Sequence, residues 1–258
     1  MTNLTTVAGV NLYTGTTGND KLVAALIPAA SAAALRYIGL DLFQATYSEV
    51  YPGTGTKRLI LRQGPVTAVT SVSVNGYAVP LSTNEWMPGY VWDSLGLWRI
   101  GCAWPQKPNV VAVTYTAGYP PLAVTDDLLP IPSALVMQTQ NPYWQADVGV
   151  SDANGNPLTK VASAPTTGQY SVDSQGNYTF NTSDQGTLVA ISYTAIGVPA
   201  DIVQAVNEIV ALEVKRRTTI DVRSKSIDGQ TISYITGQFP PSAMMVLDIH
   251  KRTFPVPA

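Results

Sequence analysis

The chain has 258 residues, a length that suits one or two domains. Hydrophobic residues make up 45% of it and charged residues only 12%, which excludes a disordered chain because disorder requires low hydrophobicity and high charge. The formal net charge of -2 is unevenly distributed, since residues 121–195 hold six acidic residues and one basic residue, a net of -5. The middle of the chain is therefore distinct in composition and predicts an inserted unit.

Cysteine and histidine each occur once, as Cys102 and His250. One cysteine excludes an internal disulfide framework and a cysteine-based zinc site, and one histidine excludes a multi-histidine metal centre. No apolar run approaches the ~18 residues of a membrane-spanning helix, and the N-terminus lacks a signal-peptide pattern. We expect a globular protein of a reducing compartment with no metal, cofactor or membrane segment, and with Cys102 as a buried thiol.

The first part of the chain predicts an arm, a helix and then strands. Residues 1–18 are rich in Thr, Gly and Asn and predict a loose, flexible arm. From Asp20 to Gly39, apolar residues recur at spacings of three and four, which predicts a helix, with a kink or restart at Pro28 because proline lacks the backbone N–H. The period then changes to two. The expected strands are 46–51 and 57–62, joined as a hairpin through 52–55, then 66–74 ending in the tight turn Asn75-Gly76, then 98–101 and 110–116.

The rest of the chain predicts a small β domain and two helices. Residues 121–145 are rich in proline and indicate a connection, and from Val148 short alternating runs predict an all-β sandwich without a helix. Helices are expected at Pro199–Arg217 and Ser242–Lys251, with a strand at Thr231–Ile235 between them. The first of these helices has a predicted apolar stripe of Val203, Val206, Val210 and Val214, widened by Ile202, Ile209 and Leu212.

One strand pattern occurs twice, at an offset of 78 residues. Val111–Ala117 (VAVTYTA) aligns with Val189–Ala195 (VAISYTA), and upstream Asn75-Gly76 is matched by Asn154-Gly155. We hypothesise that residues 121–195 are a second β unit, spliced in after the first by duplication. Convergence of strands and turns on similar patterns is the alternative. Duplication requires the same strand order in both units.

No stretch carries a catalytic or cofactor motif. Gly53–Lys57 looks like a phosphate-binding loop but lacks the spacing and the Ser/Thr after the lysine, and a hairpin turn explains it. His250 has no triad motif around it, and Asp126-Asp127 lacks calcium-loop spacing. Four of the five tryptophans lie within residues 86–104, which favours packing or a subunit interface over a stacking platform.

The order of segments resembles a known family. A helix ending in Leu35-Arg36-Tyr37-Ile38-Gly39 precedes Ala45–Tyr51 (ATYSEVY), Arg58–Val72 (RLILRQGPVTAVTSV), Val113–Tyr119 (VTYTAGY) and a helix that begins VPADIVQAV at Val198. This succession resembles the head–tail connector (adaptor, or head-completion) family of tailed bacteriophages, over residues 19–120 and 196–250. Residues 148–195 look like the small Ig-like β modules that decorate phage proteins.

The resemblance implies an α+β fold in three parts. Residues 1–18 form a flexible arm, residues 19–120 plus 196–258 form a discontinuous adaptor domain with a small helical bundle and an antiparallel β unit, and residues 121–195 form an inserted Ig-like sandwich. It also implies a structural protein, not an enzyme, that forms a ring, commonly twelve-fold, under the portal in the virion neck. Such a ring extends the DNA channel and joins the capsid to the tail. The implied partners are further copies of the chain, the portal protein, the next neck or tail protein and passing double-stranded DNA, with synthesis in the host cytoplasm.

Two sets of residues are the candidate contact sites. A basic stretch can face the channel or the portal, or it is a solvated helix end favoured by the helix dipole; it comprises Lys215, Arg216, Arg217, Arg223 and Lys225. The C-terminal segment is expected to dock on the portal or a neighbouring subunit; it comprises His250, Lys251, Arg252, Thr253, Phe254 and Pro255.

Other functions stay open on the sequence alone. One is another neck, tail or decoration protein of the virion. Another is a carbohydrate-binding or adhesion protein that uses the β insert and its aromatic residues. A hydrolase acting through His250 is a more distant alternative.

Overall fold

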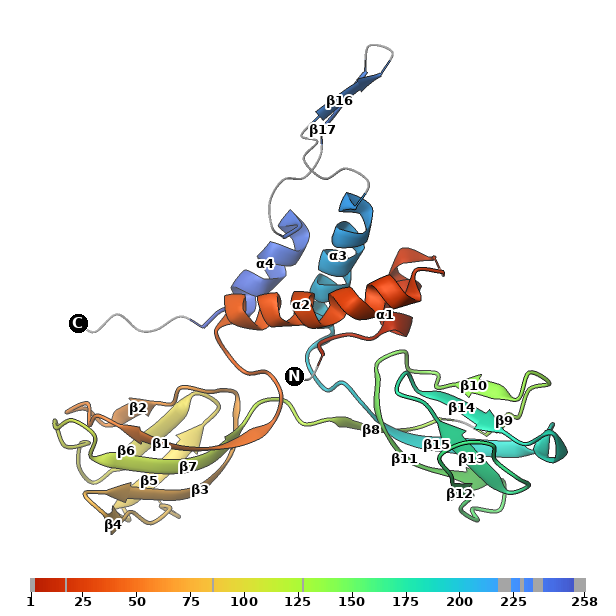
Figure 1. The fold of residues 1–258 in the computed structure, drawn as a ribbon. Helices are drawn as coiled ribbons and strands as arrows, with labels where there is room; N and C mark the ends of the chain where they lie inside the picture. The colour runs from red at the N-terminus through yellow and green to blue at the C-terminus, as the bar shows by residue number, and fades with distance from the viewer. Residues whose placement is uncertain are drawn as a thin grey trace. The chain divides into compact units, whose positions relative to one another are not determined.

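The computed structural model describes residues 3–16, 18–84, 86–126, 128–217, 224–227, 230–233 and 239–252. Over these residues the chain is α+β, with helices towards both ends of the sequence and strands between them (Figure 1). Its contacts define two compact units. One joins the N-terminal residues up to Ile38 with Pro121–Lys251, and the other is Gly39–Pro120 with Arg252. The helices therefore group with residues 121–195, whereas the predicted division grouped them with residues up to 120.

Hydrogen bonds between the helices and residues 141–143 account for this difference. The Thr6 hydroxyl donates to the carbonyl of Pro142, and the Asn207 side-chain amide donates to the hydroxyl of Tyr143 at 3.3 Å. Residues 6 and 207 thus hold the helical part against the β part of the same compact unit.

The first helix lies in the stretch predicted to be a loose arm. Helix α1 spans Val7–Thr14, and the Thr6 side chain caps it by accepting a hydrogen bond from the backbone N–H of Gly9. Leu4 and Val10 are buried. The prediction was wrong for these residues, because two apolar side chains and a capping threonine fix a helix too short to show a clear apolar period.

Helix α2 spans Asp20–Ile38 and continues through Pro28, where the sequence predicted a kink or restart. Pro28 is exposed, so the carbonyl that loses its helical partner lies at the solvent side of the helix. By length and composition α2 would also serve as a membrane span. Its apolar stripe, which includes Val23, Ile27 and Ile38, is buried, as in a core helix of a globular protein.

Helix α3 (Ala200–Arg216) packs against α1, α2 and helix α4 (Pro241–His250). Its buried residues include Ile202, Val206 and Val210, in agreement with the predicted stripe. Between α3 and α4 the chain forms an antiparallel pair of short strands, β16 (Ser224–Ile227) and β17 (Gln230–Ser233). Figure 1 shows β16 and β17 together with helices α1 to α4.

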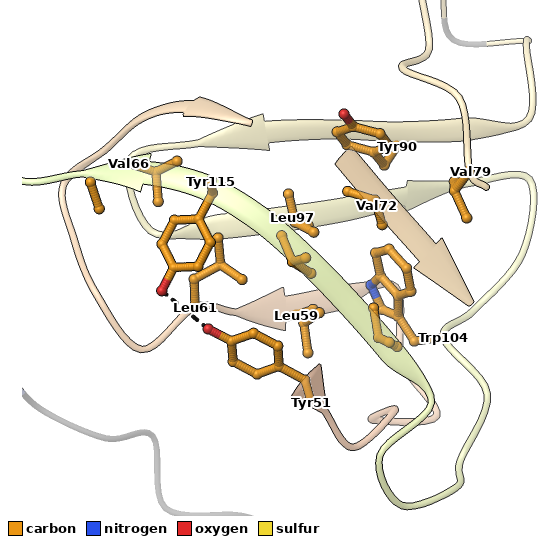
Figure 2. Packing of buried hydrophobic residues seen from close by; sticks show 13 residues of the cluster. Tyr51, Leu59, Leu61, Val66, Val72, Val79, Tyr90, Leu97, Trp104 and Tyr115 are labelled. Atoms are coloured by element: carbon orange, nitrogen blue, oxygen red, sulfur yellow. Dashed lines mark hydrogen bonds between the residues drawn. The ribbon is translucent and has the colours of Figure 1, made fainter. Parts of the chain in front are cut away.

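Residues 39–120, here called the first β unit, fold into two sheets. One has the order β1-β7-β3-β4 and the other β2-β6-β5. The strands are β1 (Ala45–Tyr51), β2 (Arg58–Ile60), β3 (Val66–Val74), β4 (Tyr77–Ala78), β5 (Gly89–Asp93), β6 (Gly96–Ile100) and β7 (Val111–Ala117). Figure 2 shows the core that both sheets share, in which Leu97, Trp104 and Tyr115 are fully buried.

The predicted hairpin between the first two strands was wrong. Strand β1 pairs with β7, and β2 pairs with β6 in the other sheet. The intervening turn crosses between the sheets, and Gly53 is needed there because a Cβ would lie 1.6 Å from the carbonyl oxygen of Pro105. The predicted turn at Asn75-Gly76 is confirmed, with φ of 50° and 82° at its two residues.

Residues 121–195, here called the second β unit, also fold into two sheets with one core. The orders are β11-β15-β8, with β9 also on β15, and β10-β14-β13-β12. The strands are β8 (Leu122–Thr125), β9 (Leu129–Pro130), β10 (Val136–Gln138), β11 (Trp144–Asp152), β12 (Thr159–Lys160), β13 (Gln169–Val172), β14 (Asn177–Phe180) and β15 (Leu188–Ala195). The core includes Tyr178, Ile191 and Tyr193.

The central strands of the two β units have the same order and register, although β4 and β9 have no matching strand in the other unit. Strand β7 lies between β1 and β3, and β15 lies between β8 and β11. The β3–β7 register runs from Val66↔Ala117 to Val74↔Val111, and the β11–β15 register runs from Trp144↔Ala195 to Asp152↔Val189, 78 residues later on both strands. Two register shifts also fall at matching places in β3 and β11. The structure therefore meets the requirement that the duplication hypothesis set.

A buried tyrosine is held in the same way in both units. The Tyr115 hydroxyl donates to Glu49 at 2.8 Å and accepts from the backbone N–H of Gln63 at 3.1 Å. The Tyr193 hydroxyl donates to Asp126 at 2.8 Å and accepts from the backbone N–H of Asn141 at 3.1 Å. The repeated Tyr-Thr-Ala of the sequence thus marks a repeated polar contact inside the core.

Candidate assembly surfaces

Helix α3 brings three of the predicted cations to its C-terminal end. Lys215 and Arg217 are exposed there, and the Arg216 guanidinium lies 3.2 Å from the carboxylate of Glu213, one turn earlier. The helix dipole favours cations at this end. Lys225 lies in β16, while Arg223 lies outside the described residues. Use of these cations towards DNA or a partner stays a prediction.

The C-terminal candidates form contacts within the fold. The Nε2 of His250 lies 2.8 Å from the carboxylate of Asp201 at the start of α3. The Lys251 ammonium lies 4.5 Å above the ring of Tyr37, and the Tyr37 hydroxyl donates to Asp248. These contacts fix both sides of the last turn of α4.

The end of the segment departs from α4. The Arg252 guanidinium donates to the carbonyl of Leu61 at 3.3 Å. Thr253, Phe254 and Pro255 lie outside the described residues, so their docking role stays a prediction.

The His250–Asp201 contact also sets the electrostatics at the start of α3. Partial burial of Asp201 opposes ionisation, but hydrogen bonds from His250 and from the backbone N–H of Ile202 outweigh it and lower the pKa of that carboxyl. The single histidine, His250, thus links the end of α4 to the start of α3.

The described part of the chain contains no group of three His, Cys, Asp or Glu side chains placed to hold a metal ion. Cys102 was predicted to be buried, and it is exposed. It follows Gly101, whose φ of 87° turns the chain out of β6, and its sulfur accepts a hydrogen bond from Arg99 Nε at 3.3 Å.

The tryptophans of the first β unit do not share one role. Trp104 is buried and donates to the carbonyl of Lys57. Trp86 is 90% exposed and Trp98 is 42% exposed. Core packing explains the buried Trp104, but it does not explain the exposed Trp86 and Trp98.

The exposed residues lie on the outer face of sheet β2-β6-β5 and in the loop before β5. Side chains alternate along a strand, so Val91 and Trp98, which follow Tyr90 and Leu97, point away from the core seen in Figure 2. Val91 and Trp98 are also cross-strand neighbours. We call Ile60, Trp86, Val91 and Trp98 the aromatic patch; all four are exposed.

The charges beside the aromatic patch neutralise one another. Arg58 makes a two-pronged contact with Asp93, at 2.7 and 3.0 Å, and its guanidinium lies 4.5 Å from the centre of the Trp98 ring. The Trp98 indole donates to Asp93 at 3.1 Å. Partial burial opposes ionisation of Asp93, but the Arg58 contact and these hydrogen bonds lower its pKa to about 2.

The second β unit carries polar residues at the matching positions. In the first unit Trp98 pairs with Val91 and Arg58. In the second, Thr179 occupies the place of Trp98 and pairs with Ser171 and Val136. Gln138 likewise stands where the first unit has Ile60. The sequence pointed to packing or an interface for the tryptophans, but only the comparison of the two units separates these roles.

The fold and these surfaces define a class of protein: an α+β protein with a small helical bundle, two tandem β units and exposed apolar and basic surfaces. A family model described as "Head completion protein" matches residues 3–137 and 136–253. The chain therefore belongs to the head completion protein family, as the resemblance of its segments indicated. It is a structural protein of a phage-type particle and not an enzyme.

Among solved structures, two similar chains come from gene transfer agent (GTA) particles. One is in "Virion of native gene transfer agent (GTA) particle", with 12% identity and a TM-score of 0.41. The other is in "Neck of empty GTA particle computed with C6 symmetry", with 13% identity and a TM-score of 0.40. Each match covers 94% of this chain and 83% of the other. No curated protein matches the chain.

Proposed function

We propose that the chain forms a ring in the neck of a tailed phage or a phage-like particle, docked under the portal. The ring extends the DNA channel and offers a platform for the next neck or tail protein. The observation that carries the proposal is the head completion family match, which runs over nearly the whole chain. Twelve copies, to match a twelve-fold portal, are part of the proposal.

The architecture supports a division of labour within each subunit. We propose that the four helices form the ring-building part and that both β units are Ig-like sandwiches inserted between α2 and α3. Two sheets over one core in each unit support the sandwich assignment. The basic end of α3 and the segment after α4 are the proposed contacts to the channel or the portal.

A deletion of the gene tests the function. The expected particles contain packaged DNA but fail to retain it or to join tails, and the wild-type chain supplied in trans restores infectious particles. Quantitative mass spectrometry of purified wild-type particles should give as many copies of this chain as of the portal protein. Normal tailed particles from the deletion would contradict the proposal.

A further inference from the structure

The aromatic patch lies outside the buried core of its own β unit, where Trp98 contacts Asp93 and Arg58. The second β unit keeps the same register with Thr179, Ser171 and Gln138 at three of the four positions. An Ig-sized unit of this topology therefore folds with polar residues there. Three exposed apolar side chains on one outer face, with a further exposed tryptophan in the loop before β5, indicate an interaction site.

The chemistry of the patch fits a protein partner. Aromatic residues and arginine are enriched at the centres of protein interfaces, where unpaired charges are depleted. The nearby Arg58 is already paired with Asp93 and stacked on Trp98, so burial leaves no charge without a partner. Nucleic acid would require cations free to contact phosphates, and Arg58 is engaged.

The same chain offers a matching surface on α4. Met245 is 70% exposed and Ile249 is 74% exposed, and their spacing of four residues places them on one face of the helix. The opposite face holds the buried Ala243 and Leu247. The neighbouring charges, Asp248 and Lys251, are of opposite sign and both contact Tyr37, so together they add no net charge to this surface. Methionine side chains adapt well to aromatic rings.

We infer that, in the assembled ring, the aromatic patch of one copy binds the Met245–Ile249 face of α4 on the neighbouring copy. The two surfaces differ, so the contact is heterologous, and heterologous contacts that close form rings. This inference rests on the proposed function, because it requires copies of the chain to assemble side by side.

A photo-crosslinking amino acid placed at Trp98 tests the contact inside native particles. The variant chain complements the deletion, particles are purified and irradiated, and crosslinked peptides are identified by mass spectrometry. The expected product is a dimer of this chain, joined to a peptide containing residues 241–250. Crosslinks within one chain, to another protein, to another part of the neighbour, or none at all would overturn the inference.

Point variants give an independent readout. The double variant Val91→Ser/Trp98→Thr installs the residues of the second β unit, and Met245→Ser/Ile249→Ser removes the α4 face. Each is expected to enter particles at least tenfold less than wild type, while its melting temperature stays within a few degrees. Val148→Ser, at an exposed apolar residue of the second β unit, is the matched control and should incorporate normally. Normal incorporation of both double variants would overturn the inference.

The two proposals fail in different ways. If wild-type particles contain this chain at portal copy number but neither readout responds, only the patch–α4 contact is wrong. If the chain is absent from particles, or present at a number unrelated to the portal, the proposed function is wrong as well.

Discussion

The two β units share a fold but differ in charge and in surface. Their central strands, register shifts and buried tyrosines match. Residues 39–120 carry five basic and four acidic residues, a net of +1, against -5 for residues 121–195. The comparison teaches that the contacts around the central strand define this fold, while the outer face of β2-β6-β5 and its counterpart are open to change.

The interiors also differ at one point. Val69 of the first unit pairs with Tyr115, and at the matching place Asp147 pairs with Tyr193. The buried Asp147 accepts hydrogen bonds from the hydroxyls of Tyr170 and Tyr178 and lies 2.9 Å from Lys160. The second unit therefore contains a polar cluster where the first is apolar.

The largest expected effect comes from removing the shared tyrosine. Tyr115→Ala and Tyr193→Ala each lose a fully buried ring and its hydrogen bonds, which should lower the unfolding free energy of the unit concerned by about 3–5 kcal/mol. Hydrogen exchange resolved by peptide measures each unit separately. The two losses of unfolding free energy should agree within about 1 kcal/mol. A loss below about 1 kcal/mol in one unit would show that the two tyrosines are not equivalent.

The polar cluster of the second unit should be the next most sensitive point. Asp147→Ala leaves two buried hydroxyls without an acceptor, each at a cost of about 1–3 kcal/mol, while Lys160 is half exposed and is not left as a buried charge. The triple variant Asp147→Val/Tyr170→Phe/Tyr178→Phe should have an unfolding free energy within about 1.5 kcal/mol of wild type, because an apolar core of similar volume leaves no polar group unsatisfied. Chemical denaturation of both variants is the measurement. A triple variant less stable than Asp147→Ala would contradict the account.

The two Asn-Gly turns should respond equally and less strongly. Gly76 and Gly155 have φ of 82° and 83°, and a Cβ at either meets no atom within 4 Å. Gly76→Ala and Gly155→Ala should therefore each cost about 1–2 kcal/mol, from backbone strain alone. Thermal unfolding of the two variants checks this, and a difference of several kcal/mol between them would show that the strain at the two glycines is not equivalent.

The smallest expected effect depends on pH and concerns one turn carboxylate in each β unit. Asp93 and Asp173 both accept hydrogen bonds from backbone N–H groups of a turn, and the pKa of each carboxyl is lowered. A lowered pKa stabilises the fold above the ordinary value near 4 and loses that effect as pH falls through the folded pKa, which is about 2 for Asp93. Asp93→Asn should cost about 1 kcal/mol or less at neutral pH, since its partners are partly exposed.

Stability measured from pH 7 to pH 2 tests this prediction. The difference between wild type and Asp93→Asn should shrink below about pH 4. Asp173→Asn serves as the matched control, because it removes the charge of a turn carboxylate for which no arginine contact is found among the described residues. A gap between wild type and Asp93→Asn that is constant with pH would contradict the assigned role of the carboxylate.

Much of the fold could be predicted where the signal is local or repeated. The apolar stripes of α2 and α3, the turn at Asn75-Gly76 and the repeat of Val111–Ala117 at Val189–Ala195 are of this kind. The pairing of strands could not be predicted in this way, because the partners lie far apart in the sequence. The sequence around Gly53 has the composition of a hairpin turn, yet the long-range pairing of β1 with β7 decides the topology.

The surroundings of the candidate residues could not be predicted, for a physical reason. A tryptophan has the same composition signal whether it fills a core, as Trp104 does, or lies exposed, as Trp86 does. That His250 and Lys251 bind a partner stays a prediction, and their contacts with Asp201 and Tyr37 depend on helices about 50 and 210 residues away. Only the assembled fold brings those side chains together.

Electron microscopy of the native particle, with the neck reconstructed at side-chain resolution, tests the central claim most directly. The account predicts a closed ring of this chain under the portal in which the first β unit contacts a neighbouring subunit through Trp86 and Trp98, while Ser171 and Thr179 of the second stay at solvent. A ring in which both β units make the same contacts, or a particle whose neck lacks the chain, would contradict it.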